Sequence, residues 1–228
     1  MYRIKSILKT ISKIIFGITI ILSVIFIPAG TFNWIEAWIF FSAYLLLVMV
    51  SLIWLKKHDP ELFKERSLRK KEGKLWDKVL LSIYTIFILM MFITCGLDAV
   101  RFKWTKVPLF IKLIGFIGFI PVTIIIYKVF KENRFASKVV RIQNDRSHKV
   151  IKTGPYKYIR HPMYLAIMLS MILIPLALGS FFALIFSFLI IIVYIIRTYF
   201  EDTTLKKELP GYTSYTKEVR YRLFPGIW

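Results

Sequence analysis

The stretch GPYKYIRHPMY, residues 154–164, leads directly into a very apolar helical hairpin in the C-terminal half of the chain. Gly154-Pro155 is a turn signal, and Pro162 suits the first turn of a helix, where its missing N–H costs no hydrogen bond. We therefore expect His161 at or near the helix cap. Gly179-Ser180 then predicts a tight turn, after which the chain returns as a second apolar helix.

The two ends of this hairpin carry most of the unusual polar residues. So tight a turn places the two helices side by side. Arg160-His161 at the start of the hairpin and Arg197, Glu201 and Asp202 at its end should then emerge at the same membrane face. The sequence therefore predicts one polar site at that face.

The rest of the chain indicates a polytopic membrane protein. It has 228 residues, 57% of them apolar, and a mean hydropathy of +0.63, too apolar for a soluble domain of this length. Only helices satisfy their own backbone hydrogen bonds in lipid, so we predict an all-α fold with about six transmembrane helices. The predicted spans are 14–30, 36–55, 78–97, 108–130, 162–178 and 181–199, and the first is interpreted as a retained helix rather than a signal peptide.

The net charge of +20 has a pattern that fits a membrane protein better than a nucleic-acid-binding one. Twenty-nine of the 33 Lys and Arg residues lie in the N-terminal tail (Arg3, Lys5, Lys9, Lys13), in 56–78, in 128–160 and from Arg197 onward. These segments fall on one side after each even crossing, as the positive-inside rule predicts. We therefore expect both termini in the cytoplasm, an inner or plasma membrane location, and basic residues facing anionic headgroups.

Two kinds of site are not expected. Cys95 stands alone inside an apolar span, so no internal disulfide can form and a core position is predicted for it. His58, His148 and His161 lie far apart with no ligand spacing, so no metal site is predicted.

The chain divides into two regions. Residues 1–130 are predicted to form a four-helix transmembrane scaffold, in which Gly115 and Gly118 indicate close helix packing or a kink. The connection 56–78 is expected to hold a short amphipathic helix with solvated charges. Residues 131–228 are predicted to form the functional core, made of a long cytoplasmic loop, the hairpin and a C-terminal tail.

Each polar residue of the core also has an ordinary explanation. Arg160 could snorkel to headgroups, and Tyr156, Tyr158 and Tyr164 could belong to an aromatic belt. Arg197 and Glu201 are spaced for an ion pair within one helix, although Glu before Arg is the better order. The order and spacing of the whole series are more specific than any one of these residues.

That series resembles the isoprenylcysteine carboxyl methyltransferase family and, more distantly, phospholipid methyltransferases. The resemblance covers about 131–228, under half of the chain. The residues that carry it are Asn133, His148-x-x-Ile-x-x-Gly154-x-Tyr156, Arg160-His161-Pro162-x-Tyr164, Arg197-x-x-x-Glu201-Asp202-x-x-Leu205, and Leu209-Pro-Gly211-Tyr212-x-x-Tyr215 with a late Pro225.

The resemblance implies an integral membrane enzyme that uses S-adenosylmethionine without a Rossmann domain, and no strand-Gly-x-Gly-x-x-Gly-helix unit is present in the sequence. The cofactor-binding residues that it implies are His148, Gly154, Tyr156, Tyr158, Arg160, His161, Pro162, Tyr164, Glu201 and Asp202. It also implies that Asn133 and Arg197 bind the substrate, and that Arg197 and Glu201 are catalytic.

The chemistry narrows the acceptor to a lipophilic small molecule or a lipid-attached group that meets a water-soluble cofactor at the membrane face. A carboxylate acceptor is already ionised and needs only a cation, such as Arg197 or Arg160, to position it. An amine or thiol acceptor would need a base, for which Glu201 is the candidate. Carboxyl O-methylation of an isoprenylcysteine-like substrate is the leading prediction, and methylation of a phospholipid amine or small thiol is the second.

Two other functions stay open on the sequence alone. Membrane sterol and steroid reductases, which use NADPH, resemble this family in their C-terminal half, although this chain has fewer spans. A non-enzymatic transport or scaffold protein is the other alternative. Acidic residues deep in the spans, which a proton-coupled carrier would use, are missing from the sequence, since Glu36 and Asp98 fall near span ends.

Overall fold

The structure of the chain is a computed structural model that describes residues 2–67 and 73–228, with side chains described for Ser12 and from Phe16 onward. Within those residues it consists of helices and loops without a β-strand, which confirms the all-helical prediction. The side chains of Arg3, Lys5, Lys9 and Lys13, and residues 68–72 of the 56–78 connection, lie outside the described part.

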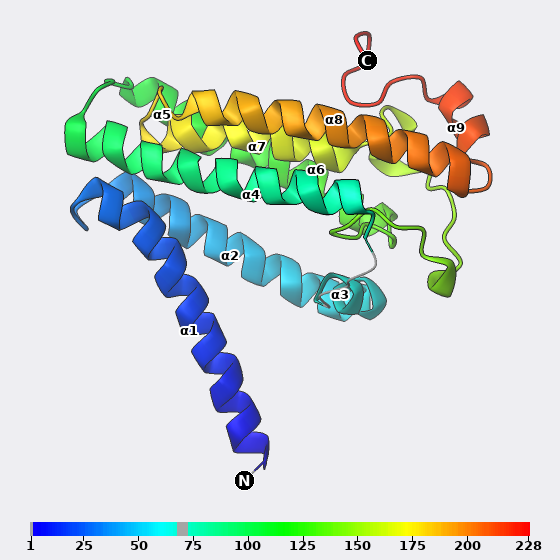
Figure 1. Cartoon of the computed structure of the whole chain (residues 1–228), viewed down its shortest axis with the longest axis horizontal. Helices are drawn as coiled ribbons and strands as arrows, with labels where there is room; N and C mark the ends of the chain where they lie inside the picture. Colours follow the sequence, from blue (N-terminus) through cyan, green and yellow to red (C-terminus); the bar gives the residue numbers. More distant parts are fainter. Residues whose placement is uncertain (1, 68–72) are drawn as a thin grey trace.

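The helices follow one another along the chain as Figure 1 shows. They are α1 (Tyr2–Ala29), α2 (Ile35–His58), α3 (Pro60–Ser67), α4 (Leu75–Gly96), the π-helix η1 (Leu97–Phe102), α5 (Leu109–Ile117), α6 (Phe119–Glu132), the 3₁₀ turns η2 (Asn144–Arg146) and η3 (Gly154–Lys157), α7 (Pro162–Leu178), α8 (Leu184–Glu208) and α9 (Tyr212–Glu218).

Four segments of the described chain have the length and apolar composition to cross a membrane. They are α2, α4 continued by η1, α5 continued by α6, and α8. The remaining two predicted spans are shorter apolar helices, Phe16–Ala29 and α7. At 1.5 Å per residue, the 17 residues of α7 extend about 25 Å, less than a hydrocarbon core of about 30 Å. Four of the six predicted crossings are thus supported, and the other two stay predictions.

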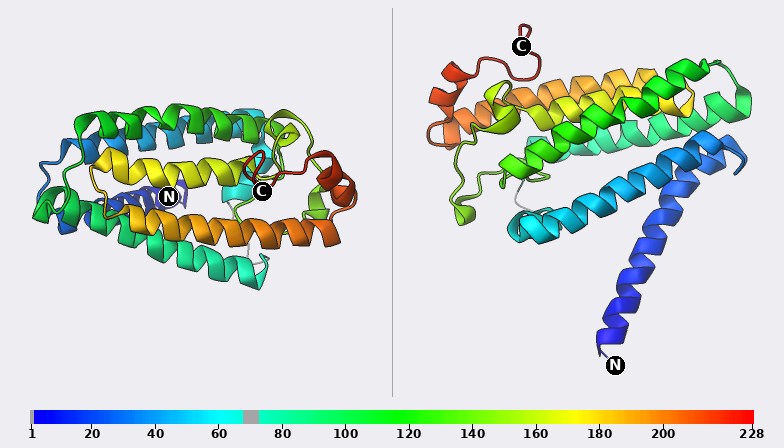
Figure 2. Two further views of the ribbon diagram at one scale, coloured as in Figure 1. Left: turned by 90° about the horizontal axis from the view of Figure 1, so that it is seen from above. Right: turned by 180° about the vertical axis from the view of Figure 1, so that it is seen from behind.

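Helix α7 occupies the centre of the bundle. It packs against α2, α4, α5, α6 and α8, and Figure 2 shows it between the α5–α6 pair and α8. It packs tightly against α5, where a Cβ on Gly115 would lie 2.4 Å from the backbone nitrogen of Ala177. Gly118 separates α5 from α6. The close packing predicted at these two glycines is confirmed, since a Cβ on Gly118 would also lie 2.5 Å from Cδ2 of Leu173.

The hairpin forms as predicted. His161 is the N-cap residue of α7 and Pro162 its first residue, while Gly179 ends the helix with φ +85°, a conformation that favours glycine. Helices α7 and α8 lie side by side. This arrangement brings the polar start of one helix to the polar end of the other.

The N-terminal helices meet the bundle unevenly. Helix α1 contacts α4 and η1, and its N-terminal part points away from the other helices (Figure 1). The predicted short helix of the 56–78 connection is present as α3. The expectation that charges in this connection are solvated is wrong for Glu65 and Asp77, which are buried because Arg141 and Arg197 pair with them.

Candidate functional site

The polar site lies where the start of α7 meets the end of α8. The His161 and Tyr164 rings are stacked, with centroids 5.6 Å apart and planes 12° from parallel. In the first turn of α7, the Tyr164 hydroxyl donates a hydrogen bond to Oε2 of Glu201 on α8. The predicted meeting of the two polar ends of the hairpin is therefore confirmed.

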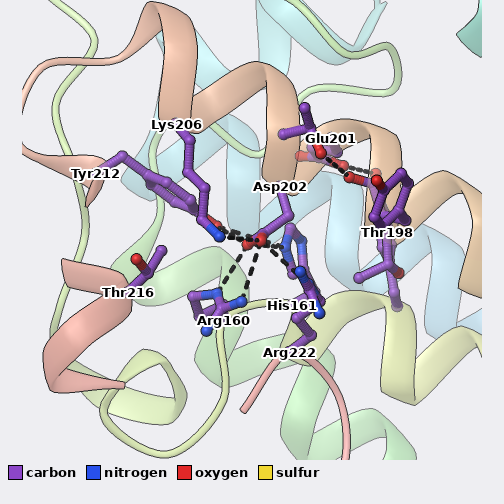
Figure 3. A network of polar contacts seen from close by, with 12 residues as sticks. Arg160, His161, Thr198, Glu201, Asp202, Lys206, Tyr212, Thr216 and Arg222 are labelled. Carbon is purple, nitrogen blue, oxygen red and sulfur yellow. Dashed lines mark hydrogen bonds and ion pairs between the residues drawn. The ribbon is translucent and has the colours of Figure 1, made fainter. Parts of the chain in front are cut away.

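Asp202, one residue further along α8, is the centre of a buried polar network (Figure 3). Its side chain is 1% exposed and accepts from Nε and Nη2 of Arg160 at 2.8 and 3.1 Å. The Tyr212 hydroxyl donates to Oδ1 at 3.0 Å and Nε of Arg222 to Oδ2 at 3.1 Å. Further partners are Nζ of Lys206 at 3.3 Å and Nε2 of His161 at 3.5 Å. Several cationic or hydroxyl donors thus compensate one buried carboxylate.

The guanidinium of Arg160 also fixes the C-terminal tail. Its Nη1 donates to the carbonyl oxygens of Val219 and Arg220, both at 2.7 Å. The backbone continues the contact, with the amide of Arg160 donating to Tyr221 at 3.0 Å and that of His161 to Arg222 at 2.9 Å. Both sides of the guanidinium are therefore occupied, and the tail lies against the start of α7.

The approach segment before α7 is held from both sides. Gly154 has φ +58°, and a Cβ there would lie 2.4 Å from Cγ of Glu132. The Tyr156 hydroxyl accepts from Nδ2 of Asn133 at 2.8 Å, while its carbonyl accepts from the Tyr215 hydroxyl at 2.7 Å. Burial raises the pKa of both tyrosines, so their phenols stay protonated at neutral pH.

Arg197 does not form the ion pair with Glu201 that its helical spacing allows. Its Nε donates instead to Oδ1 of Asp77 on α4 at 2.7 Å, and its Nη2 to the carbonyl of Lys138 at 3.0 Å. The guanidinium carbon lies 5.0 Å from the centre of the Tyr164 ring. Arg197 thus supports the ring whose hydroxyl holds Glu201.

A pocket of about 100 Å³ opens between these elements. Its aromatic wall is formed by Phe135, His148, Tyr156, His161, Tyr164, Tyr212 and Tyr215, and its polar groups include Asn133, Arg141, Lys149, Arg160 and Glu201. Aliphatic side chains complete it, among them Val139, Val150, Ile151, Leu205 and Leu209. The pocket therefore combines aromatic faces, an apolar side and a carboxylate.

His148 faces this pocket as a neutral ring. Burial, helped by the nearby Arg141 and Arg146, lowers its pKa to about 4. Its Nδ1 accepts from the amide of Gln143 at 3.4 Å, and the ring packs on Phe135 with centroids 4.6 Å apart. It adds no positive charge to the pocket at neutral pH.

The predicted site residues fall into two groups in space. Those that line the pocket are Asn133, His148, Tyr156, Arg160, His161, Tyr164 and Glu201. Gly154, Tyr158, Pro162, Arg197 and Asp202 are not among the residues that line it. Tyr158 is 71% exposed, whereas Arg197 and Asp202 are buried behind the wall and hold other residues in place.

Two acidic residues that support the site were not predicted, because they lie in a part of the chain where the sequence shows no motif. Asp77 binds Arg197, and Glu65 on α3 forms a bidentate pair with Arg141 at 3.2 and 3.0 Å. Both acids anchor the loop that carries the pocket wall. The sequence gives no signal for Glu65, and for Asp77 it gives only a position beside an apolar span, which does not name a partner.

A comparison with models of known protein families found a match, which includes most of this site. Residues 128–207, which include the hairpin and most of the pocket, match the model of the "Isoprenylcysteine carboxyl methyltransferase (ICMT) family". No curated protein matches the chain. The matched region holds the paired Arg-His-Pro-x-Tyr and Arg-x-x-x-Glu blocks, and residues 128–207 are therefore similar to the isoprenylcysteine carboxyl methyltransferase family.

Proposed function

We propose that the chain is an S-adenosylmethionine-dependent methyltransferase that acts on a lipophilic acceptor at the cytoplasmic membrane face. Carboxyl O-methylation of an isoprenylcysteine-like substrate is the proposed reaction. The observation that carries the proposal is Glu201, a carboxylate at the pocket that forms no ion pair within residues 2–67 and 73–228. The negative charge of the Glu201 carboxylate is therefore available to bind a cationic ligand.

The surroundings of Glu201 suit a sulfonium cofactor. A sulfonium is a cation with little hydration, and such groups bind at aromatic faces close to a carboxylate. The Tyr164 and His161 rings stand beside Glu201, and neutral His148 does not repel a cation. The flat adenine of the cofactor would find further aromatic faces on Tyr156 and Phe135.

The ion pairs of the basic residues around the pocket limit which of them can bind the acceptor. The guanidinium groups of Arg141, Arg160 and Arg197 are engaged with acidic side chains. Lys149 lines the pocket and makes no ion pair in the described part of the chain. We propose Lys149 as the cation that attracts an acceptor carboxylate and Asn133 as a residue that contacts the acceptor, while Arg197 acts from behind the pocket wall by supporting the Tyr164 ring.

The bound cofactor supplies an electrophilic methyl group. The chain contributes alignment, because an in-line displacement gains most from holding donor and acceptor at contact distance. A carboxylate acceptor needs no base, so Glu201 acts on the donor side and the Tyr164 hydroxyl holds it in place. For an amine or thiol acceptor, the second proposed class, Glu201 would take the proton.

Calorimetry on the detergent-purified full chain tests the cofactor. S-adenosylmethionine is expected to bind, and His161→Ala to weaken it about tenfold through loss of the ring beside Tyr164. His58→Ala is the matched control, because His58 is an exposed histidine of α2. Binding of NADPH instead of S-adenosylmethionine would replace the proposal with a reductase, and binding of neither to folded protein would refute an enzymatic role.

A further inference from the structure

Asp77 is a fully buried carboxylate at the start of α4, outside residues 128–207. Its Oδ1 accepts from Nε of Arg197 at 2.7 Å, and its Oδ2 from the amide of Val140 at 2.8 Å. Asp77 therefore joins a scaffold helix, the end of the hairpin and the loop that lines the pocket.

The contact between Asp77 and Arg197 also determines which partner is left for Glu201. Arg197 and Glu201 are four residues apart on α8, a spacing at which opposite charges pair on a helix surface. In the structure the guanidinium is turned to Asp77 and to the Lys138 carbonyl. Glu201 is left with the neutral Tyr164 hydroxyl as its hydrogen-bond partner.

We infer that Asp77 is a positioning residue that keeps Arg197 away from Glu201, so that the Glu201 carboxylate stays available to the sulfonium of the methyl donor. The inference rests on the proposed function. Without the Asp77 charge, the nearest carboxylate on the same helix for Arg197 is Glu201. An ion pair there would neutralise the charge that the pocket presents to a cation.

The sharpest readout compares two ligands that differ at this point alone. S-adenosylmethionine carries the sulfonium charge, and S-adenosylhomocysteine has a neutral sulfur in its place. Asp77→Asn is expected to weaken S-adenosylmethionine about tenfold more than S-adenosylhomocysteine, measured by calorimetry on the full chain. General loosening of the pocket would weaken both ligands equally and leave their affinity ratio unchanged.

A second substitution separates sequestration of Arg197 from simple structural support. The double variant Asp77→Asn/Arg197→Gln has no guanidinium at position 197 that could neutralise Glu201. Its affinity for S-adenosylmethionine relative to S-adenosylhomocysteine should therefore return to within about twofold of the wild-type ratio. Because the double variant leaves no buried unpaired charge, it should fold even where Asp77→Asn does not. A double variant whose ratio stays about tenfold low would overturn the inference.

Asp98→Asn is the matched control for placing a buried amide where a carboxylate was. Asp98 is also fully buried, but it accepts from neutral donors of Thr105, Ser180 and Phe182 near the turn between α7 and α8. Its substitution should leave the ratio unchanged. If the wild type binds neither ligand, the proposed function itself is refuted. If the wild type binds both ligands and Asp77→Asn leaves the ratio of the two affinities unchanged, only the role of Asp77 is refuted.

Discussion

Arg160 and Asp202 form a bidentate ion pair across 42 residues of sequence, with side chains 3% and 1% exposed. This pair joins the start of α7 to the end of α8. It also holds the C-terminal tail, because the remaining guanidinium nitrogen of Arg160 donates to two carbonyls of the tail. The pair is therefore a structural tie directly behind the pocket wall.

Asp202→Asn should destabilise the protein strongly. Removing one partner of a buried pair leaves an uncompensated charge, at a cost of about 3 kcal/mol or more. We expect a lower Tm in detergent and faster proteolysis of the tail beyond Glu218. Glu208→Gln is the control, because the Lys74–Glu208 pair is 36% and 41% exposed and should contribute below about 1 kcal/mol. Equal losses of stability in the two variants would contradict the assignment.

Gly154→Ala should disturb the approach to α7. The residue has φ +58°, and the added Cβ would collide with Glu132 of α6 at 2.4 Å. Positive φ costs an alanine roughly 1 kcal/mol before the collision is counted. Differential scanning fluorimetry should show a lower Tm. Gly17→Ala in α1, where nothing lies within 4 Å of the new Cβ, should keep or slightly raise it.

The loop that carries His148 should lose stability in acid. Its pKa is about 4 in the folded protein, against an ordinary value near 6.5, because burial and two arginines disfavour the charged ring. Between those values the unfolded state binds more protons, so this contribution is complete above pH 6.5 and is lost as the pH falls toward 4. His148→Gln should therefore flatten the dependence of Tm on pH between 4 and 6.5. If the Tm of His148→Gln depends on pH as steeply as that of the wild type, groups other than His148 account for this dependence.

Much of the hairpin was predictable because its signals are local. The apolar runs, Pro162 and Gly179-Ser180 define two adjacent helices and a cap, and those rules need no knowledge of the rest of the chain. The tight turn also predicted that Arg160-His161 and Arg197–Asp202 lie at the same end of the hairpin, although it did not predict the hydrogen bond between Tyr164 and Glu201. Local signals therefore predicted the face on which the candidate site lies.

The partners of the buried charges were not predictable from the sequence. Arg197 lies 120 residues from Asp77, and its nearer neighbour Glu201 is the one that helix spacing favours. Helix α4 must first be packed against α8 before Asp77 becomes the better partner. The same applies to Glu65 and Arg141, which are 76 residues apart. Tertiary packing, which sequence spacing does not contain, decides between such alternatives.

The most direct test is transfer of an isotope-labelled methyl group. The purified full chain, in vesicles made from extracted membrane lipids, is incubated with S-adenosylmethionine labelled in its methyl group. We predict label in the lipid fraction, released as methanol by mild alkali because it is held as a carboxyl methyl ester, and reduced at least tenfold by Glu201→Gln. Donor binding without label in any lipid fraction would contradict the account.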